Sequence, residues 1–269
     1  MTLEIITTTM HKSNIEKYTE MNLQTDAVIA NQGENSCYEE HELNGKKIKF
    51  VSTQTRGVGN NRNIGYIHSS ADLILFADDD MVFVDEYENI IKDAFSKTPQ
   101  ADGIVFGVKN GMQFSSNKRA KFKNVTSGGI WGLVIKREFL LQNNIWASPL
   151  FGGGARYSCG EDSLFFKDLF KNKARIFLST QNIATNNEGE STWFEGFTDK
   201  YFVDRGIIYA KLTPMLAHLA CLYHLFKHKN VRYKDIDIKK AIRLSFLGVK
   251  IARNPRKGVK LYEDFICQL

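Results

Sequence analysis

The sequence has only four cysteines, and no two of them have the spacing of a metal-binding pair. They lie far apart, at Cys37, Cys159, Cys221 and Cys267, and none belongs to a C-x-x-C motif. This distribution argues against both a zinc site and a disulfide framework. We therefore expect all four side chains to be reduced thiols.

The sequence also lacks a targeting signal and a long uninterrupted apolar run. The first residues, MTLEIITTTMHKS, have no basic leader and no apolar core, because Glu4 interrupts them. We therefore read no signal peptide and expect a cytoplasmic protein. The most apolar stretch, residues 207–226, contains Lys211, Pro214 and two histidines, which disfavour a membrane span. We expect a helix there that packs on the preceding domain or lies at a membrane interface.

Positive charge is concentrated in the last part of the chain. The 269 residues carry a net charge of +6, and the segment from Lys227 onward holds twelve Lys or Arg residues against four acidic ones. Within it, residues 238–253 have the pattern of a basic amphipathic helix. Such a helix can bind an anionic surface on the inner face of the cell membrane, or it can be a packed helix with a solvated basic face. We expect no nucleic-acid partner.

The order of strand-like and helix-like segments predicts an α/β fold. With 43% hydrophobic residues, the chain has ample material for a large core. Residues 31–42 read as a loop, and the first four strands are expected at residues 3–9, 27–30, 47–52 and 73–77. The β-α-β order predicts a mixed, mainly parallel sheet flanked by helices. We expect this domain over residues 1–206 and a basic helical C-terminal extension over residues 207–269.

Three consecutive aspartates follow the fourth of these strands. Residues 73–77 are wholly apolar, which fits a strand buried on both faces, and they are followed by Asp78, Asp79 and Asp80. If the extended geometry continues, Asp78 and Asp80 point the same way and can share one cation. Carboxylate oxygens favour Mn²⁺ or Mg²⁺. The alternative is that the aspartates only end the strand by capping a turn.

A glycine-rich, basic segment precedes this strand. Residues 56–65, RGVGNNRNIG, contain Arg56 and Arg62 and lead into a helix that ends near Ser69. A glycine-rich turn with arginines before a helix offers backbone N–H and guanidinium groups to a phosphate. Because the carboxyl ends of parallel strands meet at one edge, we expect this segment and the aspartates to face one pocket. A plain surface turn is the alternative.

Two further segments contain glycine and tryptophan residues that can contact a sugar. Gly128 and Gly129 precede a strand with Trp131, and a loop farther along the chain holds Trp193. Paired glycines let a ligand approach the backbone closely, and an aromatic ring can stack on a sugar face. Trp131 also suits the core, and Trp193 a hydrophobic clasp, so both alternatives stay open.

A second acidic site is expected where a glycine-rich loop delivers Glu161 and Asp162 to the start of a helix. A carboxylate held rigidly there can act as a general base. The helix dipole should lower its pKa and keep it ionised at neutral pH. In the alternative interpretation these acidic side chains only cap the helix.

The order and spacing of these motifs resemble those of family 2 glycosyltransferases with a GT-A fold, over roughly residues 3–206. The resemblance rests on the Gly/Arg/Asn-rich segment, the apolar strand that ends in a D-x-D motif, the glycine pair before a strand, and the Glu-Asp pair that opens a helix. The chain departs from many members at residues 8–10, TTM, and 31–33, NQG, where those members carry a proline-tyrosine-asparagine sequence and an aspartate-rich turn.

The resemblance implies an inverting enzyme that moves a sugar from a nucleotide-sugar donor to a hydroxyl of a glycan or lipid-linked glycan, in the synthesis of cell-surface polysaccharide. It implies that Asp78 and Asp80 bind Mn²⁺ or Mg²⁺ and that Asp162, beside Glu161, deprotonates the acceptor. Donor-binding roles fall on Thr8, Arg56, Arg62, Asp78 and Asp79. Acceptor-binding or sugar-binding roles fall on Gly128, Gly129, Trp131 and Trp193.

Two other function classes stay open at the level of sequence. A nucleotidyltransferase also uses a related sheet and a carboxylate-bound metal, but it needs a glycine-rich phosphate loop after the first strand, where this chain has TTTMHKS. A non-enzymatic scaffold docked to a membrane through the basic segment explains residues 207–260 but not the two acidic sites.

Overall fold

The computed structural model describes the chain except for residues 127–128, 188–195, 255–256 and 268–269. The chain forms two compact units, which we describe separately. The sheet unit comprises residues 1–150 and 161–190, and the helical unit comprises residues 151–160 and 191–269. The domain boundary expected at residue 206 falls inside helix α7 (Asp199–Leu212), which continues without a break across that position.

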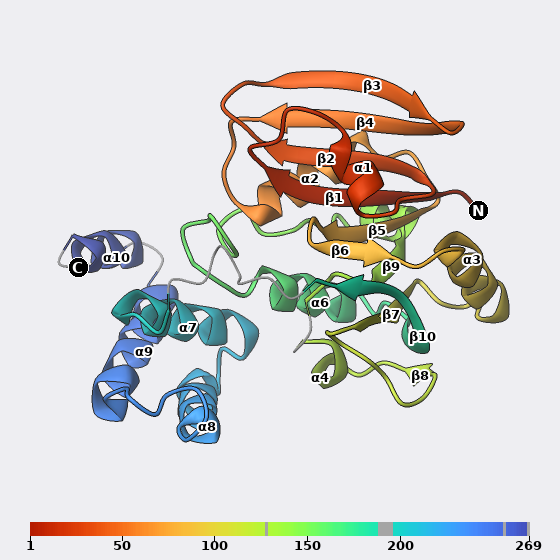
Figure 1. Cartoon of the computed structure of the whole chain (residues 1–269). Helices are drawn as coiled ribbons and strands as arrows, with labels where there is room; N and C mark the ends of the chain where they lie inside the picture. The colour runs from red at the N-terminus through yellow and green to blue at the C-terminus, as the bar shows by residue number, and fades with distance from the viewer. Residues whose placement is uncertain (127–128, 188–195, 255–256, 268–269) are drawn as a thin grey trace. The chain divides into compact units, whose positions relative to one another are not determined.

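Within the described residues, ten strands form one sheet in the order β3-β4-β2-β1-β5-β9-β7-β10-β6, with β8 paired to β10 (Figure 1). Four neighbouring strands run parallel: β4 (Lys46–Thr53), β2 (Asp26–Gln32), β1 (Leu3–Met10) and β5 (Leu73–Asp78). The others are β3 (Cys37–Leu43), β6 (Met81–Phe83), β7 (Gly103–Lys109), β8 (Lys118–Arg119), β9 (Leu133–Lys136) and β10 (Ile176–Asn186). The mixed, mainly parallel sheet expected from the sequence is confirmed.

Apolar side chains cover both faces of the central strands. Ile5 of β1 and Leu75 of β5 belong to one core cluster, whereas the next residues along the same strands, Ile6 and Phe76, belong to the other. This alternation places one core on each side of the sheet. The wholly apolar strand before the aspartates is therefore buried on both faces, as predicted.

Strand β3 corrects the loop that the sequence analysis expected over residues 31–42. It pairs antiparallel with β4 at the end of the sheet, and its sequence, CYEEHEL, is mostly exposed. Backbone hydrogen bonds hold such an edge strand without apolar alternation, and its charged side chains discourage pairing with another chain. The loop prediction is wrong because the sequence signal for a strand is apolar alternation, which this strand lacks.

Six helices are described in the sheet unit: α1 (Glu16–Glu20), α2 (Val58–His68), α3 (Tyr87–Lys97), α4 (Phe122–Val125), α5 (Arg137–Gln142) and α6 (Glu161–Lys171). The helix predicted to follow the glycine-rich segment is confirmed, but it begins at Val58, so most of the segment lies inside α2 and only Arg56 and Gly57 precede it. A Cβ added at Gly59 would lie 2.1 Å from the Ser148 carbonyl oxygen, and one at Gly65 would lie 2.2 Å from Ile6 Cγ2. These glycines let α2 pack closely on its neighbours.

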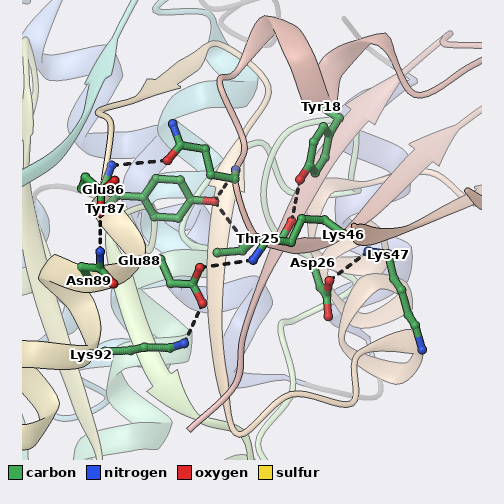
Figure 2. Close-up of polar contacts among 11 residues, drawn as sticks. Tyr18, Thr25, Asp26, Lys46, Lys47, Glu86, Tyr87, Glu88, Asn89 and Lys92 are labelled. Atoms are coloured by element: carbon green, nitrogen blue, oxygen red, sulfur yellow. Dashed lines mark hydrogen bonds and ion pairs between the residues drawn. The ribbon is translucent and has the colours of Figure 1, made fainter. Parts of the chain in front are cut away.

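A buried hydrogen-bond network lies at the end of the sheet where strand β2 begins (Figure 2). The Tyr87 hydroxyl accepts from the Gln24 backbone N–H at 3.0 Å and lies 2.8 Å from the Thr25 hydroxyl. The Tyr18 hydroxyl donates to the Thr25 carbonyl oxygen at 2.9 Å. Burial raises the pKa of Tyr87 to about 12, so its phenol stays neutral. Neutral hydroxyl and backbone groups that hydrogen-bond to one another therefore stabilise this end of the sheet, which lies opposite the carboxyl ends of the parallel strands.

The helical unit contains α7, α8 (Ala217–His228), α9 (Ile238–Arg253) and α10 (Gly258–Ile266). The single helix expected over residues 207–226 is wrong, because the chain leaves helical geometry around Pro214 and starts again as α8. α7 and α9 cross closely at Gly206 and Gly248, where an added Cβ would lie 1.9 and 2.0 Å from backbone oxygens of the opposite helix. No helix in the described ranges is long and apolar enough to cross a membrane.

Candidate active site

One buried arginine joins the two acidic segments of the sheet unit. The Arg62 side chain, on α2, is 3% exposed, and its Nη2 donates to Asp78 Oδ1 at 3.1 Å. Its Nη1 donates to Asp162 Oδ1 at 2.9 Å and to Glu161 Oε1 at 3.3 Å. We call these four residues the Arg62 cluster. The end of β5, the middle of α2 and the start of α6 therefore meet at one point.

The asparagines around Arg62 fix the position of α2. Asn61 Nδ2 donates to the carbonyl oxygens of Thr9 and Ala30, at 3.1 and 3.2 Å, which ties the helix to the ends of β1 and β2. Asn63 exchanges two hydrogen bonds with the Ala147 backbone, at 2.8 and 2.9 Å. The asparagines of this segment therefore hold α2, and with it Arg62, in place, and the predicted binding of a phosphate by the segment stays a prediction.

The Arg62 cluster contains three carboxyl groups and only one guanidinium. These carboxylates raise the pKa of Arg62 against the opposing effect of burial, so the arginine stays charged. Its Nε is buried and has no hydrogen-bond partner among the described residues. Nearby carboxylates disfavour one another's ionised forms unless positive charge is added. The cluster is therefore an electrostatic environment that a cation would stabilise.

The electrostatics of Asp162 differ from the sequence prediction. Loss of water raises the pKa of Asp162 to about 7, the charges of Glu161 and Asp78 add to this, and Arg62 and the Ile130 backbone N–H oppose it. The expectation that the helix dipole lowers this pKa is wrong, because desolvation and the neighbouring carboxylates outweigh the dipole. The side chain remains 25% exposed, so a substrate group can reach it. A carboxyl group with a pKa near neutrality suits general base catalysis.

The aspartate triplet does not continue the strand. β5 ends at Asp78, and Asp79 and Asp80 lie in a turn, so strand alternation does not determine the direction of Asp80. Asp79 Oδ2 accepts a hydrogen bond from Thr9 Oγ1 at 2.5 Å, and its carbonyl oxygen accepts one from Lys17 Nζ at 3.0 Å. Asp80 is exposed, although desolvation of its carboxyl group and the charge of Asp78 raise its pKa.

Two of these contacts involve residues that the sequence analysis missed. Thr9 could have been found, because it stands at the carboxyl end of β1, beside Asn31 of β2 in the sheet register. Thr8, which was predicted, is buried and lies directly opposite Asp78 on the neighbouring strand. Lys17 carries no comparable signal, because only the fold brings α1 to the aspartate turn.

Gly129 lies beside the Arg62 cluster. Its φ of +74° falls in the left-handed region, and an added Cβ would lie 2.3 Å from Trp131 Nε1 and 3.2 Å from Asp162 Oδ2. Trp131 precedes β9 rather than lying within it, and it packs partly buried against one of the two cores. Because Gly129 has no Cβ, the Trp131 indole packs against its backbone, next to the carboxyl group of Asp162.

The remaining predicted residues are not part of the described cluster. Arg56 is exposed just before α2, and its carbonyl oxygen accepts a hydrogen bond from Asn60 Nδ2 at 2.6 Å. Of the two arginines in this segment, Arg62 is the one that reaches the carboxylates. Gly128 and Trp193 lie outside the described residues.

The cluster offers carboxylate oxygens to a cation without enclosing one. Among the described residues, no group of three or more His, Cys, Asp and Glu side chains is arranged to hold a metal ion. Asp78 is 37% exposed and Asp80 is exposed, so both carboxyl groups are accessible. Mg²⁺ and similar hard cations usually take one or two carboxylates and complete their shell with water and substrate phosphates. The residues present fit a cation of that kind.

Comparison with known proteins identifies the fold. No protein-family model matches the chain, and no curated protein matches it by sequence. The structure of S. aureus TarS in complex with UDP-GlcNAc matches with a TM-score of 0.63 at 14% identity, covering 95% of this chain and 82% of that chain. The chain has the GT-A-like fold of TarS. The TarS complex with UDP gives a TM-score of 0.61 at 14% identity, with 97% and 83% coverage. The fold implied by the resemblance is therefore confirmed.

Proposed function

We propose that this protein is a metal-dependent, inverting glycosyltransferase that moves a sugar from a nucleotide-sugar donor to a hydroxyl group of a glycan acceptor. The observation that carries the proposal is the Arg62 cluster, which joins a carboxylate at the end of β5 to two carboxylates at the start of α6 on a GT-A-like fold. The TarS structures with UDP-GlcNAc and UDP support a nucleotide-sugar donor.

The donor side of the site is built on the aspartate turn. Asp78 and Asp80 would hold Mn²⁺ or Mg²⁺, which when bound supplies neutralisation of the charge that develops on the diphosphate leaving group. Arg62 uses only one oxygen of Asp78 in its ion pair, at 3.1 Å. The hydrogen bond from Thr9 holds Asp79 at the start of the turn and so fixes the backbone from which Asp80 projects.

The acceptor side of the site is built on the start of α6. Asp162 takes the proton of the acceptor hydroxyl, which makes that oxygen a better nucleophile toward the anomeric carbon. Arg62 Nη1 holds Asp162 Oδ1 in place, while Oδ2 lies next to Gly129 and the Trp131 indole. The same guanidinium bonds Asp78 and Asp162, so it fixes the distance between the donor side and the base. A single in-line displacement of this kind inverts the anomeric configuration.

The proposal is tested by a turnover screen over UDP-, GDP- and dTDP-sugars in Mn²⁺, with water as the acceptor. We expect slow hydrolysis of at least one nucleotide sugar, and the loss of this hydrolysis when the cation is chelated. A parallel arm supplies nucleoside triphosphates with sugar phosphates. Turnover in that arm alone would assign nucleotidyl transfer, and a protein that neither hydrolyses nor binds any donor would contradict sugar transfer.

A further inference from the structure

The outer side of α8 is apolar and exposed. Its inner side is buried through Ala217, Cys221 and Leu225. Facing away from that core are large apolar side chains that are each at least 57% exposed, which we call the α8 outer face: Met215, Leu216, Leu219, Tyr223 and Phe226. The last four are separated by three or four residues, so they line one side of the helix. A helix that is apolar on both sides needs a second covering partner.

The neighbouring helix does not have this property. The apolar residues of α9 lie inside the helical unit, since Ala241 packs in a cluster with Leu225, and Val249 in a cluster with Cys221. The outward side chains of α9 include Arg243 and Lys250, which are exposed. The sequence analysis offered α9 as a membrane-binding amphipathic helix, but no large apolar side chain of α9 is among the exposed ones, whereas its exposed residues include basic ones. Most of the exposed large apolar side chains described in this unit belong to the α8 outer face, with Val231 and Val259 as the others.

The charge around α8 is of one sign. No acidic residue occurs between Asp204 and Asp235, and that interval contains several basic residues, at Lys211, Arg205, Lys227, Lys229, Arg232 and Lys234. Lys227 Nζ lies 5.5 Å from the centre of the Tyr223 ring, so a positive charge borders the apolar side chains directly. Two copies of this surface would bring like charges together, whereas an anionic lipid surface complements both the charge and the apolar side chains.

We propose that the α8 outer face docks the protein on an anionic phospholipid bilayer. The helix lies in the plane of the interface, its apolar side chains enter the boundary between headgroups and acyl chains, and the lysines around it contact lipid phosphates. The exposed basic residues of α9 add to the attraction. The proposal goes beyond sugar transfer and does not rest on it, because every residue in the argument belongs to the helical unit.

The test is co-sedimentation of the full chain with vesicles of phosphatidylcholine alone and of phosphatidylcholine with phosphatidylglycerol. We expect binding to the anionic vesicles, weaker binding in high salt, and little binding to the neutral vesicles. Leu219→Glu/Phe226→Glu should reduce the bound-to-free ratio by about tenfold or more, since burial of even one large apolar side chain changes an equilibrium by roughly that factor. The control is Ile67→Glu/Leu141→Glu, which alters two exposed apolar residues of the sheet unit and should bind like the wild type.

Circular dichroism checks that both double variants are folded. We expect both to fold, because all four substituted side chains are exposed. Absence of wild-type binding to anionic vesicles, or equal binding by Leu219→Glu/Phe226→Glu, would overturn the proposal. So would an equal loss in the Ile67→Glu/Leu141→Glu control. Light scattering without vesicles covers the remaining occupant: a dimer that the α8 substitutions dissociate would assign this face to a second copy of the chain and also overturn membrane docking.

Discussion

The sheet unit and the helical unit each contain a cluster of charged side chains. The two clusters differ in how many cations and hydrogen-bond donors each carboxylate has. In the helical unit, Asp204 is fully buried, and its Oδ2 accepts from the Ser158 backbone N–H and hydroxyl, both at 2.9 Å, and from Lys200 Nζ at 2.7 Å. Its Oδ1 accepts from the Tyr262 hydroxyl at 2.8 Å. Asp204 thus accepts four hydrogen bonds, one of them from a cation. We call Asp204, Ser158, Lys200 and Tyr262 the Asp204 hub.

The Arg62 cluster has the opposite balance. Three carboxyl groups share one guanidinium, and the buried Arg62 Nε has no partner among the described residues. A buried carboxylate that accepts hydrogen bonds from several donors is stable without a ligand. Within the helical unit, Asp204 of α7 connects α7 to α10 and to the loop that precedes α6. An excess of carboxylates over positively charged groups is instead stabilised by a cation that binds among them. The difference indicates a structural role for the Asp204 hub and supports our proposal that the Arg62 cluster binds a ligand.

The largest effect is expected from Asp204→Ala. It leaves Lys200, Ser158 and the Tyr262 hydroxyl without their common acceptor, so the free energy of unfolding should fall by about 3 kcal/mol or more. Urea denaturation measures this. The matched control is Asp199→Ala, on the same helix, which removes a partly exposed ion pair with Lys240 and should cost about 1 kcal/mol or less. Equal losses in the two variants would remove the distinction between a buried hub and a surface pair.

Asp162→Asn should produce the reverse pattern. Asparagine cannot take a proton, so donor hydrolysis should fall on the order of a hundredfold or more. Stability should be unchanged or higher, because asparagine can still accept from Arg62 and the repulsion from Glu161 is relieved. Initial rates and thermal melts report the two effects. Asp168→Asn, on the same helix, is the control and should retain activity. A melting temperature that falls together with activity would instead support the helix-capping interpretation.

The pH dependence of stability should distinguish the wild type from Asp162→Asn. The pKa of Asp162 is raised from 3.8 in the unfolded chain to about 7 in the folded protein. Between these values the folded state binds more protons than the unfolded state, so this group makes stability fall as pH rises. The metal-free wild type should therefore lose stability relative to Asp162→Asn from about pH 4 to about pH 7. Parallel stability curves for the two proteins would show that Asp162 has an ordinary pKa.

The smallest effect is expected from Tyr262→Phe, which removes one hydroxyl whose single proton is shared between Asp204 Oδ1 at 2.8 Å and the Arg156 carbonyl oxygen at 3.0 Å. The cost should be about 1 kcal/mol, because Asp204 keeps its other donors. Denaturation of the variant measures it, with Tyr223→Phe, an exposed tyrosine of α8, as the control. A loss as large as that of Asp204→Ala would mean that the Tyr262 contact alone holds the hub together.

The parts of the site that could be predicted from sequence are those with a local signal. The apolar run of β5 and the alternation of β1 mark buried strands, and the carboxyl ends of such strands locate Asp78 and Thr8. The acidic residues at the start of α6 follow from the apolar spacing of the helix after them. These are properties of a few consecutive residues, so no knowledge of the fold was needed.

The parts that could not be predicted depend on distant segments. Arg62 bonds a residue 100 positions away, and nothing in its own segment distinguishes that role from phosphate binding. The glycines of α2 suggest a turn until the close contacts of Gly59 and Gly65 are known. Likewise, the hydrophobicity of α8 does not reveal which side is covered, because that depends on how α7 and α9 pack against it.

The central claim, that the aspartate turn beside the Arg62 cluster binds a nucleotide-sugar donor through a divalent cation, is tested most directly by isothermal titration. The donor identified in the turnover screen is titrated into wild type, Asp80→Ala and Asp93→Ala, each with Mn²⁺ and with chelator, where Asp93 is a carboxylate on the surface of α3. We expect wild type and Asp93→Ala to bind the donor only with Mn²⁺, and Asp80→Ala to lose this binding. Unchanged affinity of Asp80→Ala in Mn²⁺, or equal wild-type affinity in chelator, would contradict the central claim.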